Sequence, residues 1–291
     1  MFRALRRFVH KLTGKNAVIF FIVIFLICVV SICLGIYSQY FYKYSATDPL
    51  MLGIHIGSKK TAQEYAELKA NFSKLFTNQL HVYKDSDDVD VSKIENGKSL
   101  VYKGYSIENE DENYYQVNID LPIININTNK VKQINKEIKE DYYDKANNIM
   151  RTAKSYTVYK VSYVSYINEG VLSVVIRETY KSGNTAETVI VKTYNYSIPD
   201  DKELSLNDLI KLKKTDKETV QKTIDETIEI EYNNALAIEE EFGSTYKRDL
   251  KNEIYKVDNA ISYFLTDDGY VYIIYAYGEY ADTNEIDIVI F

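Results

Sequence analysis

The sequence contains few of the residues that most enzymes use for catalysis or metal binding. It has two cysteines, Cys28 and Cys33, which both lie in one apolar run, and three histidines, which all lie in the first 81 residues. Residues 82–291 therefore hold no thiol and no imidazole, and the whole chain lacks tryptophan. This composition argues against zinc sites, haem ligation and Cys–His or Ser–His catalysis in residues 82–291. We expect no catalytic residue, no metal site and no cofactor.

Proline and glycine are also scarce, with three and eleven residues in a chain of 291. Hydrophobic residues make up 46% of the chain and charged residues 26%. This composition is unlike that of collagen-like or disordered proteins, so most of the chain should fold. The length allows one or two domains, since a domain usually has about 100 to 200 residues.

One long hydrophobic run is present, at residues 17–37. Its 21 residues carry no charge, and fifteen of them are Val, Ile, Leu or Phe. At about 1.5 Å per residue, a helix of this run is about 31 Å long, which matches a hydrocarbon core of roughly 30 Å. Five basic residues and no acidic residue precede the run. The positive-inside rule therefore predicts a cell-membrane protein with a single-pass transmembrane helix, a cytoplasmic tail at residues 1–16 and an extracytoplasmic part at residues 38–291.

Two other kinds of export signal fit the run less well. A cleaved signal peptide has an apolar region of about 7 to 15 residues, followed by small residues at alternate positions. A lipoprotein signal needs a small residue before the lipidated cysteine, and Ile32 precedes Cys33. An uncleaved signal anchor is the favoured interpretation.

The predicted extracytoplasmic part is acidic. Residues 38–291 hold 30 basic and 42 acidic residues, which gives a formal charge of −12. A body of this charge repels nucleic acid and attracts cationic partners, although solubility alone can also explain it. We expect no nucleic-acid binding.

Residues 38–98 read as a juxtamembrane segment, a helix and an acidic linker. A helix is predicted over residues 61–78, with Thr61 and Glu64 at capping-box spacing. The acidic run at residues 85–90 resembles a calcium loop, but it offers Val89 where an EF-hand needs an oxygen ligand. A solvated linker is therefore favoured for this run.

Residues 99–291 show the patterns of an α+β domain, with an antiparallel sheet packed by helices. Ser205 to Asp208 should cap a short helix, Thr215 and Glu218 form a possible capping box, and Gly243 should end the helix that follows. Strands are predicted at residues 99–107, 113–121, 155–167, 171–180, 187–197, 261–265, 270–276 and 285–291, and longer helices at residues 128–154 and 216–242.

Two local expectations concern polar residues in this domain. The acidic residues 108–112 read as a loop between two strands. In the strand at residues 171–180, Leu172, Val174 and Ile176 should face the core, which would leave Ser173 and Arg177 on a face in contact with water.

Three stretches of the domain resemble a known family. They are Glu203-Leu-Ser-Leu-Asn-Asp-Leu-Ile210, Phe264-Leu-Thr-Asp-Asp-Gly-Tyr-Val-Tyr-Ile-Ile-Tyr275 and Glu285-Ile-Asp-Ile-Val-Ile-Phe291. With the order of the elements from about residue 98 onward, they resemble the extracytoplasmic domain of RsiV-type anti-sigma factors, which is also attached to some peptidoglycan deacetylases of Gram-positive bacteria. The resemblance implies a non-catalytic module outside the cell that binds lysozyme, a basic protein.

The sequence departs from this family in two places. The tail of about 16 residues is too short to fold around a sigma factor. The loop at residues 277–284 differs from the proline- and glycine-containing loop of the lysozyme binders. The resemblance therefore predicts a sensor or binding protein without the sigma-binding region, and it leaves the partner open between lysozyme, another cationic protein and the cell wall.

Tyrosines near the end of the chain are the candidate binding residues. Tyrosine offers a rigid contact area and a hydroxyl, which suits interfaces, although most of the 28 tyrosines should serve as sheet packing. The rival interpretation is a glycan-active enzyme that uses paired carboxylates, either Glu279 with Asp282 or Asp267 with Asp268. The candidate residues for binding are Tyr270, Tyr272, Tyr275, Tyr277, Glu279, Tyr280 and Asp282.

Overall fold

The computed structural model describes residues 67, 69–82, 99–243, 246–278 and 283–291. The predicted tail, the apolar run at residues 17–37 and most of the segment at residues 38–98 lie outside these ranges. Among the described residues, no helix has both the length and the apolar character needed to cross a bilayer. The transmembrane helix and the domain boundaries before residue 99 stay predictions.

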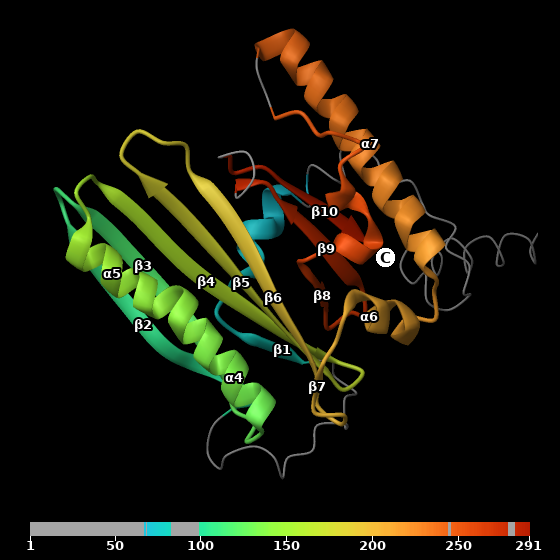
Figure 1. Cartoon of the computed structure of the whole chain (residues 1–291), viewed down its shortest axis with the longest axis horizontal. Coiled ribbons are helices and arrows are strands. Elements are labelled where there is room, and N and C mark those ends of the chain that lie inside the picture. Colours follow the sequence, from blue (N-terminus) through green and yellow to red (C-terminus); the bar gives the residue numbers. More distant parts are fainter. Residues whose placement is uncertain (1–66, 68, 83–98, 244–245, 279–282) are drawn as a thin grey trace, which may run out of the picture. The chain divides into compact units, whose positions relative to one another are not determined.

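A seven-stranded sheet forms the larger part of the domain (Figure 1). Its strands follow the order β2-β3-β4-β5-β6-β7, and β1 lies beside the last residues of β4. Five of the predicted strands belong to it. The bounds are β1 Leu80–Val82, β2 Val101–Asp111, β3 Tyr115–Ile124, β4 Thr157–Asn168, β5 Val171–Ser182, β6 Thr188–Ser197 and β7 Lys202–Glu203.

The sheet is mixed, whereas the sequence predicts an antiparallel one. β2–β3, β4–β5, β5–β6 and β6–β7 are antiparallel, but β3 and β1 both pair with β4 in parallel. The parallel pair β3–β4 arises because a long helical connection, and not a hairpin, joins these two strands. The α+β class is confirmed, with sheets in which antiparallel pairs dominate.

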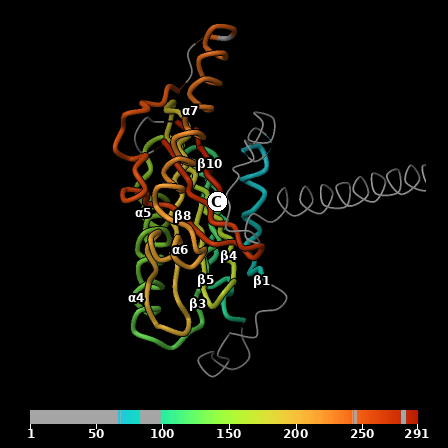
Figure 2. Tube along the Cα trace, turned by 90° about the vertical axis from the view of Figure 1, so that its right-hand side faces the viewer, coloured from blue at the N-terminus to red at the C-terminus, as the bar shows by residue number. Residues whose placement is uncertain are grey.

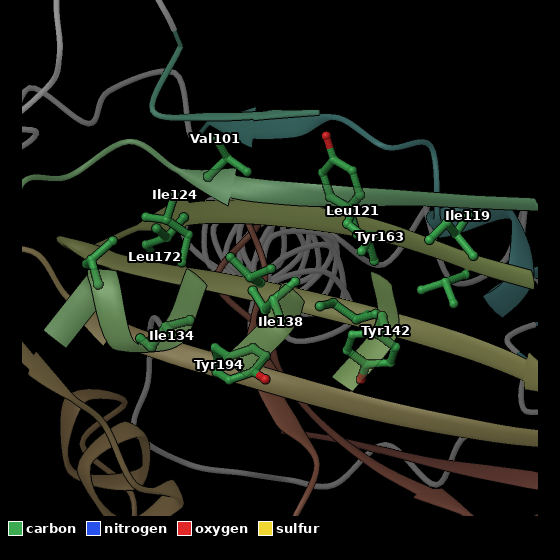
Figure 3. Close-up of a cluster of buried hydrophobic side chains, with 14 of the residues drawn as sticks. Val101, Ile119, Leu121, Ile124, Ile134, Ile138, Tyr142, Tyr163, Leu172 and Tyr194 are labelled. Carbon is green, nitrogen blue, oxygen red and sulfur yellow. The ribbon is translucent and has the colours of Figure 1, made fainter. Parts of the chain in front are cut away.

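The helix predicted at residues 128–154 covers one face of this sheet. It consists of α4 (Asn129–Ile138), a π-helical segment η4 (Lys139–Asp144) and α5 (Lys145–Thr152), and the Thr128 side chain caps it. Ile134, Ile138 and Tyr142 lie against the sheet (Figure 3), since the apolar residues recur on one side of the helix. Figure 2 shows α4 and α5 on the side of the sheet opposite to the short helical segment that ends at η2 (Ser73–Leu75).

The opposite face of the sheet is covered by a second, three-stranded sheet in the order β10-β9-β8. Its strands are β8 (Tyr263–Leu265), β9 (Val271–Ala276) and β10 (Ile286–Ile290). Val164, Val175 and Val191 of the large sheet share one apolar cluster with Phe264, Ile274 and Ile288 of the small sheet.

The second sheet corrects the expectation of a solvent-facing side for β5. Ser173 and Val175 both have 0% of their surface exposed. The Ser173 hydroxyl donates to Asn195 at 2.7 Å and accepts from the Leu265 N–H at 3.0 Å. A polar residue in a strand therefore fits a buried sheet-to-sheet interface here because its hydrogen bonds are completed inside it.

Two helices cover the outer face of the small sheet. α6 (Leu206–Leu212) begins with the predicted capping box of Ser205 and Asp208, and α7 spans Lys217–Phe242. Asp216 caps α7 by accepting from the Thr219 N–H, so the predicted box at Thr215 is wrong by one residue. Gly243 follows the helix with φ +97°, a conformation that suits glycine. The domain therefore consists of layers in the order helix, sheet, sheet, helix.

The acidic residues 108–112 are not a loop. β2 continues to Asp111, and only residues 112–114 form the turn into β3. The strand extends this far because each residue from Ser106 to Asp111 pairs with a residue of β3.

Replacing Ser173 with alanine tests the buried interface between the sheets. We expect Ser173→Ala to lower the free energy of unfolding by about 1–3 kcal/mol, because it leaves the Leu265 N–H buried without its acceptor. Urea denaturation followed by circular dichroism measures the loss. Ser155→Ala, at an exposed position, is the control and should change stability by less than about 0.5 kcal/mol. Equal small effects would contradict the buried role of Ser173.

Candidate binding site at the end of strand β9

The predicted binding residues lie along β9 and in the connection from β9 to β10. Tyr270 and Tyr272 are half-buried, whereas Tyr275 and Tyr277 are buried. Glu279, Tyr280 and Asp282 lie outside the described residues.

The two buried tyrosines belong to the core. Tyr275 and Tyr277 point toward α7 because odd-numbered residues of β9 face the helices and even-numbered ones face the large sheet. The Tyr277 hydroxyl lies 3.1 Å from that of Tyr255. Neither side chain offers a surface to a partner in this structure, which corrects the expectation for these two residues.

Both ends of the β9–β10 connection are fixed in place. The Tyr277 N–H donates to the Glu285 carbonyl at 3.0 Å. Gly278 is packed so closely that an added Cβ would lie 2.6 Å from the Thr283 carbonyl oxygen and 2.6 Å from the Val189 nitrogen. Because both contacts are with backbone atoms, only glycine fits at this position.

The buried carboxylate of Asp287 lies next to Tyr277, the residue at the start of the connection. Asp287 on β10 has none of its surface exposed. Arg248 donates to both of its oxygens, through Nε at 2.9 Å and through a terminal nitrogen at 2.8 Å. The Tyr277 hydroxyl donates to the same carboxylate at 2.9 Å. This bidentate pair is of the strongest kind that proteins form, since two parallel charge-assisted bonds share one geometry.

Three further charged residues complete an ion cluster, which we define as Lys69, Glu231, Arg248, Glu285 and Asp287. The Lys69 ammonium lies 3.1 Å from Asp287, 2.9 Å from Glu231 and 3.4 Å from Glu285. Arg248 also reaches Glu285 at 3.3 Å. The ion cluster therefore joins the helical segment near residue 69, α7, the segment after α7 and β10.

The charges in the ion cluster shift one another's protonation. Burial would raise the pKa of Asp287, but the hydrogen bonds and charges of Arg248 and Lys69 outweigh it and leave this pKa lowered. Burial would lower the pKa of Lys69, yet the attraction of Asp287 and Glu231 leaves it raised. Burial and the nearby Asp287 carboxylate raise the pKa of the Tyr277 hydroxyl. Asp287 is therefore negatively charged, Lys69 positively charged and the Tyr277 hydroxyl neutral at neutral pH.

A small apolar groove opens beside the same end of β9, with a volume of about 40 Å³. Ile190, Ile254, Ile274 and Ala276 line it, together with Ile261, which is 65% exposed. The Tyr275 hydroxyl is buried without a hydrogen-bond partner among the described residues. A groove of this size holds the end of one aliphatic side chain or a few water molecules.

The second predicted carboxylate pair lies in the turn between β8 and β9. The Asp268 carboxylate accepts from the Thr266 hydroxyl, and the Thr266 and Asp267 carbonyls accept from the buried Asn168 amide. These bonds fix the turn in the way that acidic turn residues commonly do. In the described part of the chain, no group of three or more His, Cys, Asp or Glu residues is placed to hold a metal ion.

Sequence reasoning missed the ion cluster. The alternation of residues 285–291 places Asp287 on the strand face opposite Ile286 and Ile288, but nothing in this pattern shows that α7 covers that face. Arg248 follows α7 in an irregular segment, and Lys69 lies 218 positions before Asp287. An acidic residue on an otherwise apolar closing strand was the only signal available.

Removing Arg248 tests the energetic role of the ion cluster. We expect Arg248→Met to lower the free energy of unfolding by about 3–5 kcal/mol, because it leaves a buried carboxylate with less compensation. The control Lys217→Met breaks an exposed pair with Asp258 and should cost no more than about 1 kcal/mol. Urea denaturation followed by circular dichroism compares the two variants.

The pH dependence of the same variant gives a second, independent readout. In the wild type the lowered pKa of Asp287 gives stability that is present above its ordinary value of 3.8 and is lost as the pH falls through the lower folded value. Without the guanidinium, burial should raise this pKa instead. As the pH falls from about 7 to about 5, the folded variant should take up a proton at Asp287 and gain stability. The difference in free energy of unfolding between wild type and Arg248→Met should therefore become smaller over this range. A constant difference over this range would contradict the assignment.

The solved structures that have limited likeness to this chain include two DUF3298 family proteins. A DUF3298 family protein from Pseudomonas aeruginosa PAO1 aligns over 65% of this chain and 87% of its own, with 13% identity and a TM-score of 0.35. A member of the DUF3298 family from Bacteroides fragilis NCTC 9343 aligns over 60% of this chain and 79% of its own, with 12% identity and a TM-score of 0.25. No protein-family model matches the sequence, and no curated protein matches it. At these TM-scores the likeness assigns neither a family nor a function.

Proposed function

We propose that the chain is a single-pass, membrane-anchored binding or sensor protein whose domain lies outside the cytoplasmic membrane. The apolar run at residues 17–37 serves as the anchor, and the α+β domain, which includes Lys69 and β1 as well as residues 99–291, is the binding domain. The domain has no catalytic role in this proposal. Its partner is a cationic protein, for which lysozyme is the candidate that the RsiV-like resemblance suggests, or a component of the cell wall.

The proposal rests on the anchored ends of the β9–β10 connection. The connection begins at Gly278, which is packed against β6, and ends at Glu285, which is part of the ion cluster. Between these fixed ends the sequence places Glu279, Tyr280 and Asp282. A short segment with two acids and one tyrosine between rigid ends suits recognition of a cationic surface, because less conformational entropy is lost on binding.

The charge of residues 38–291 supports the same partner class. A formal charge of −12 raises the rate of encounter with cationic proteins and lowers it for polyanions such as nucleic acids. The ion cluster itself does not serve as the binding surface, because Asp287, Arg248 and Glu231 are buried and Arg248 forms ion pairs with both acids.

Membrane topology is tested by cysteine labelling in intact cells. In a full-length variant with Cys28 and Cys33 changed to alanine, we expect Ile261→Cys to react with a membrane-impermeant maleimide, since this side chain is 65% exposed. Lys11→Cys, in the predicted cytoplasmic tail, should react only after the membrane is permeabilised. Labelling of Lys11→Cys but not of Ile261→Cys in intact cells would overturn the proposed orientation.

Partner binding is tested with the full-length protein in detergent micelles and lysozyme as the cationic probe. We expect Glu279→Gln combined with Asp282→Asn to weaken binding about five- to thirtyfold, as the loss of two charge pairs of roughly 0.5–1 kcal/mol each implies. Binding should also weaken as salt is raised. Glu226→Gln combined with Glu229→Gln removes the same charge from an exposed face of α7 and serves as the control.

This binding test decides whether the β9–β10 connection contacts the partner. An equal loss in both double variants, or binding that salt leaves unchanged, would contradict recognition through the β9–β10 connection.

A further inference from the structure

The outer edge of β2 is the longest exposed strand edge that the described residues contain. β2 runs over eleven residues and stands first in the order of the large sheet, and β3 is its only neighbour among the described strands (Figure 1). A register shift interrupts its pairing between Lys103 and Tyr105, but Ser106 to Asp111 pair with β3 without interruption. This regular stretch of six residues therefore has its second row of backbone groups free of any described strand.

The two faces of this stretch differ in chemistry. Ser106, Glu108 and Glu110 alternate onto one face, and all three are exposed. Asp120 of β3 lies on the same face, where it accepts from the Ser106 hydroxyl at 2.6 Å. On the other face, Tyr105 and Ile107 pack against the core beneath η4 and α5.

Acidic side chains on a strand edge restrict what can pair with it. A free edge is a template for another strand, and proteins commonly block it with charge or with a bulge. A second copy of this chain would bring Glu108 and Glu110 against identical residues, which like-charge repulsion disfavours. A strand that carries positive charges on the matching face meets no such barrier.

We propose that the Ser106–Asp111 edge of β2 binds an extended basic peptide by strand addition. The peptide would add an eighth strand to the large sheet through main-chain hydrogen bonds. Its Lys or Arg side chains, at alternate positions, would face Glu108 and Glu110, and its β-branched or other apolar side chains would extend the face of Ile107. This site is separate from the β9–β10 connection and does not depend on the function proposed above.

A synthetic peptide of nine alternating lysine and valine residues is the probe for this site. Fluorescence anisotropy with the full-length protein in detergent micelles measures its affinity, and amide hydrogen exchange locates it. We expect binding to slow exchange within residues 106–111. A peptide of the same sequence, N-methylated at four central residues, keeps the charge but loses the main-chain donors, and it should bind at least about tenfold more weakly.

Protein variants separate the edge from general electrostatics. Glu108→Gln combined with Glu110→Gln should weaken binding about fivefold, since two cross-strand charge pairs are lost. The matched pair Glu226→Gln with Glu229→Gln, and the loop pair Glu279→Gln with Asp282→Asn, should leave the affinity within about twofold. Equal affinity for the methylated peptide, unchanged exchange at residues 106–111, or an equal loss in all three double variants would each overturn the proposal.

Discussion

The Asp287 carboxylate is the group on which the smaller sheet and its covering segments depend. It is fully buried on β10, and it receives hydrogen bonds from Arg248, Lys69 and Tyr277. A buried charge is costly unless its partners satisfy it, so the segments that carry these partners are held together around it. These segments are 218 and 39 positions away in sequence for Lys69 and Arg248, and ten positions away for Tyr277.

The ion cluster accounts for a charged residue on β10, a strand that is covered on both faces. Ile286, Ile288 and Ile290 of β10 pack toward the large sheet, and Val289 and Phe291 pack toward α7. Asp287 lies on the α7 side among these apolar residues. Apolar residues in place of the whole buried pair could be about as stable, so we infer that the paired carboxylate contributes specificity, because only one register of β10 brings it to Arg248.

Both proposed recognition sites use acidic groups. The two ends of the β9–β10 connection are held by the packing of Gly278 and by the ion cluster, and the edge of β2 is held by its pairing with β3. Tyr105 packs against Tyr143 at 5.0 Å between ring centroids, which ties the β2 edge to the π-helical segment. Acidic residues held on a paired strand, as Glu108 and Glu110 are on β2, favour cationic partners without the cost of ordering a flexible surface.

The sequence by itself determined the elements and much of their packing. Alternation predicted β4, β5 and β6, the 3.6-residue period predicted the α4–α5 helix and α7, and local hydrogen bonds fixed the cap at Ser205. These features depend on residues within a few positions of one another, so a single sequence contains their signal.

The tertiary structure alone decided what lies on the second face of each strand. From the sequence alone Ser173 is expected to face solvent, but in the structure β8 covers it. Asp287 likewise lies on the polar face of the last strand in the sequence pattern, but in the structure α7 and Arg248 enclose it. Tyr275 and Tyr277 are core residues for the same reason, since the helices cover their face of the small sheet. The acidic residues from Glu108 to Asp111 lie in a strand because they pair with β3, which is also a tertiary contact. The alternation of residue types along a strand shows that its two faces differ. Only the layers packed on the strand determine which face meets water.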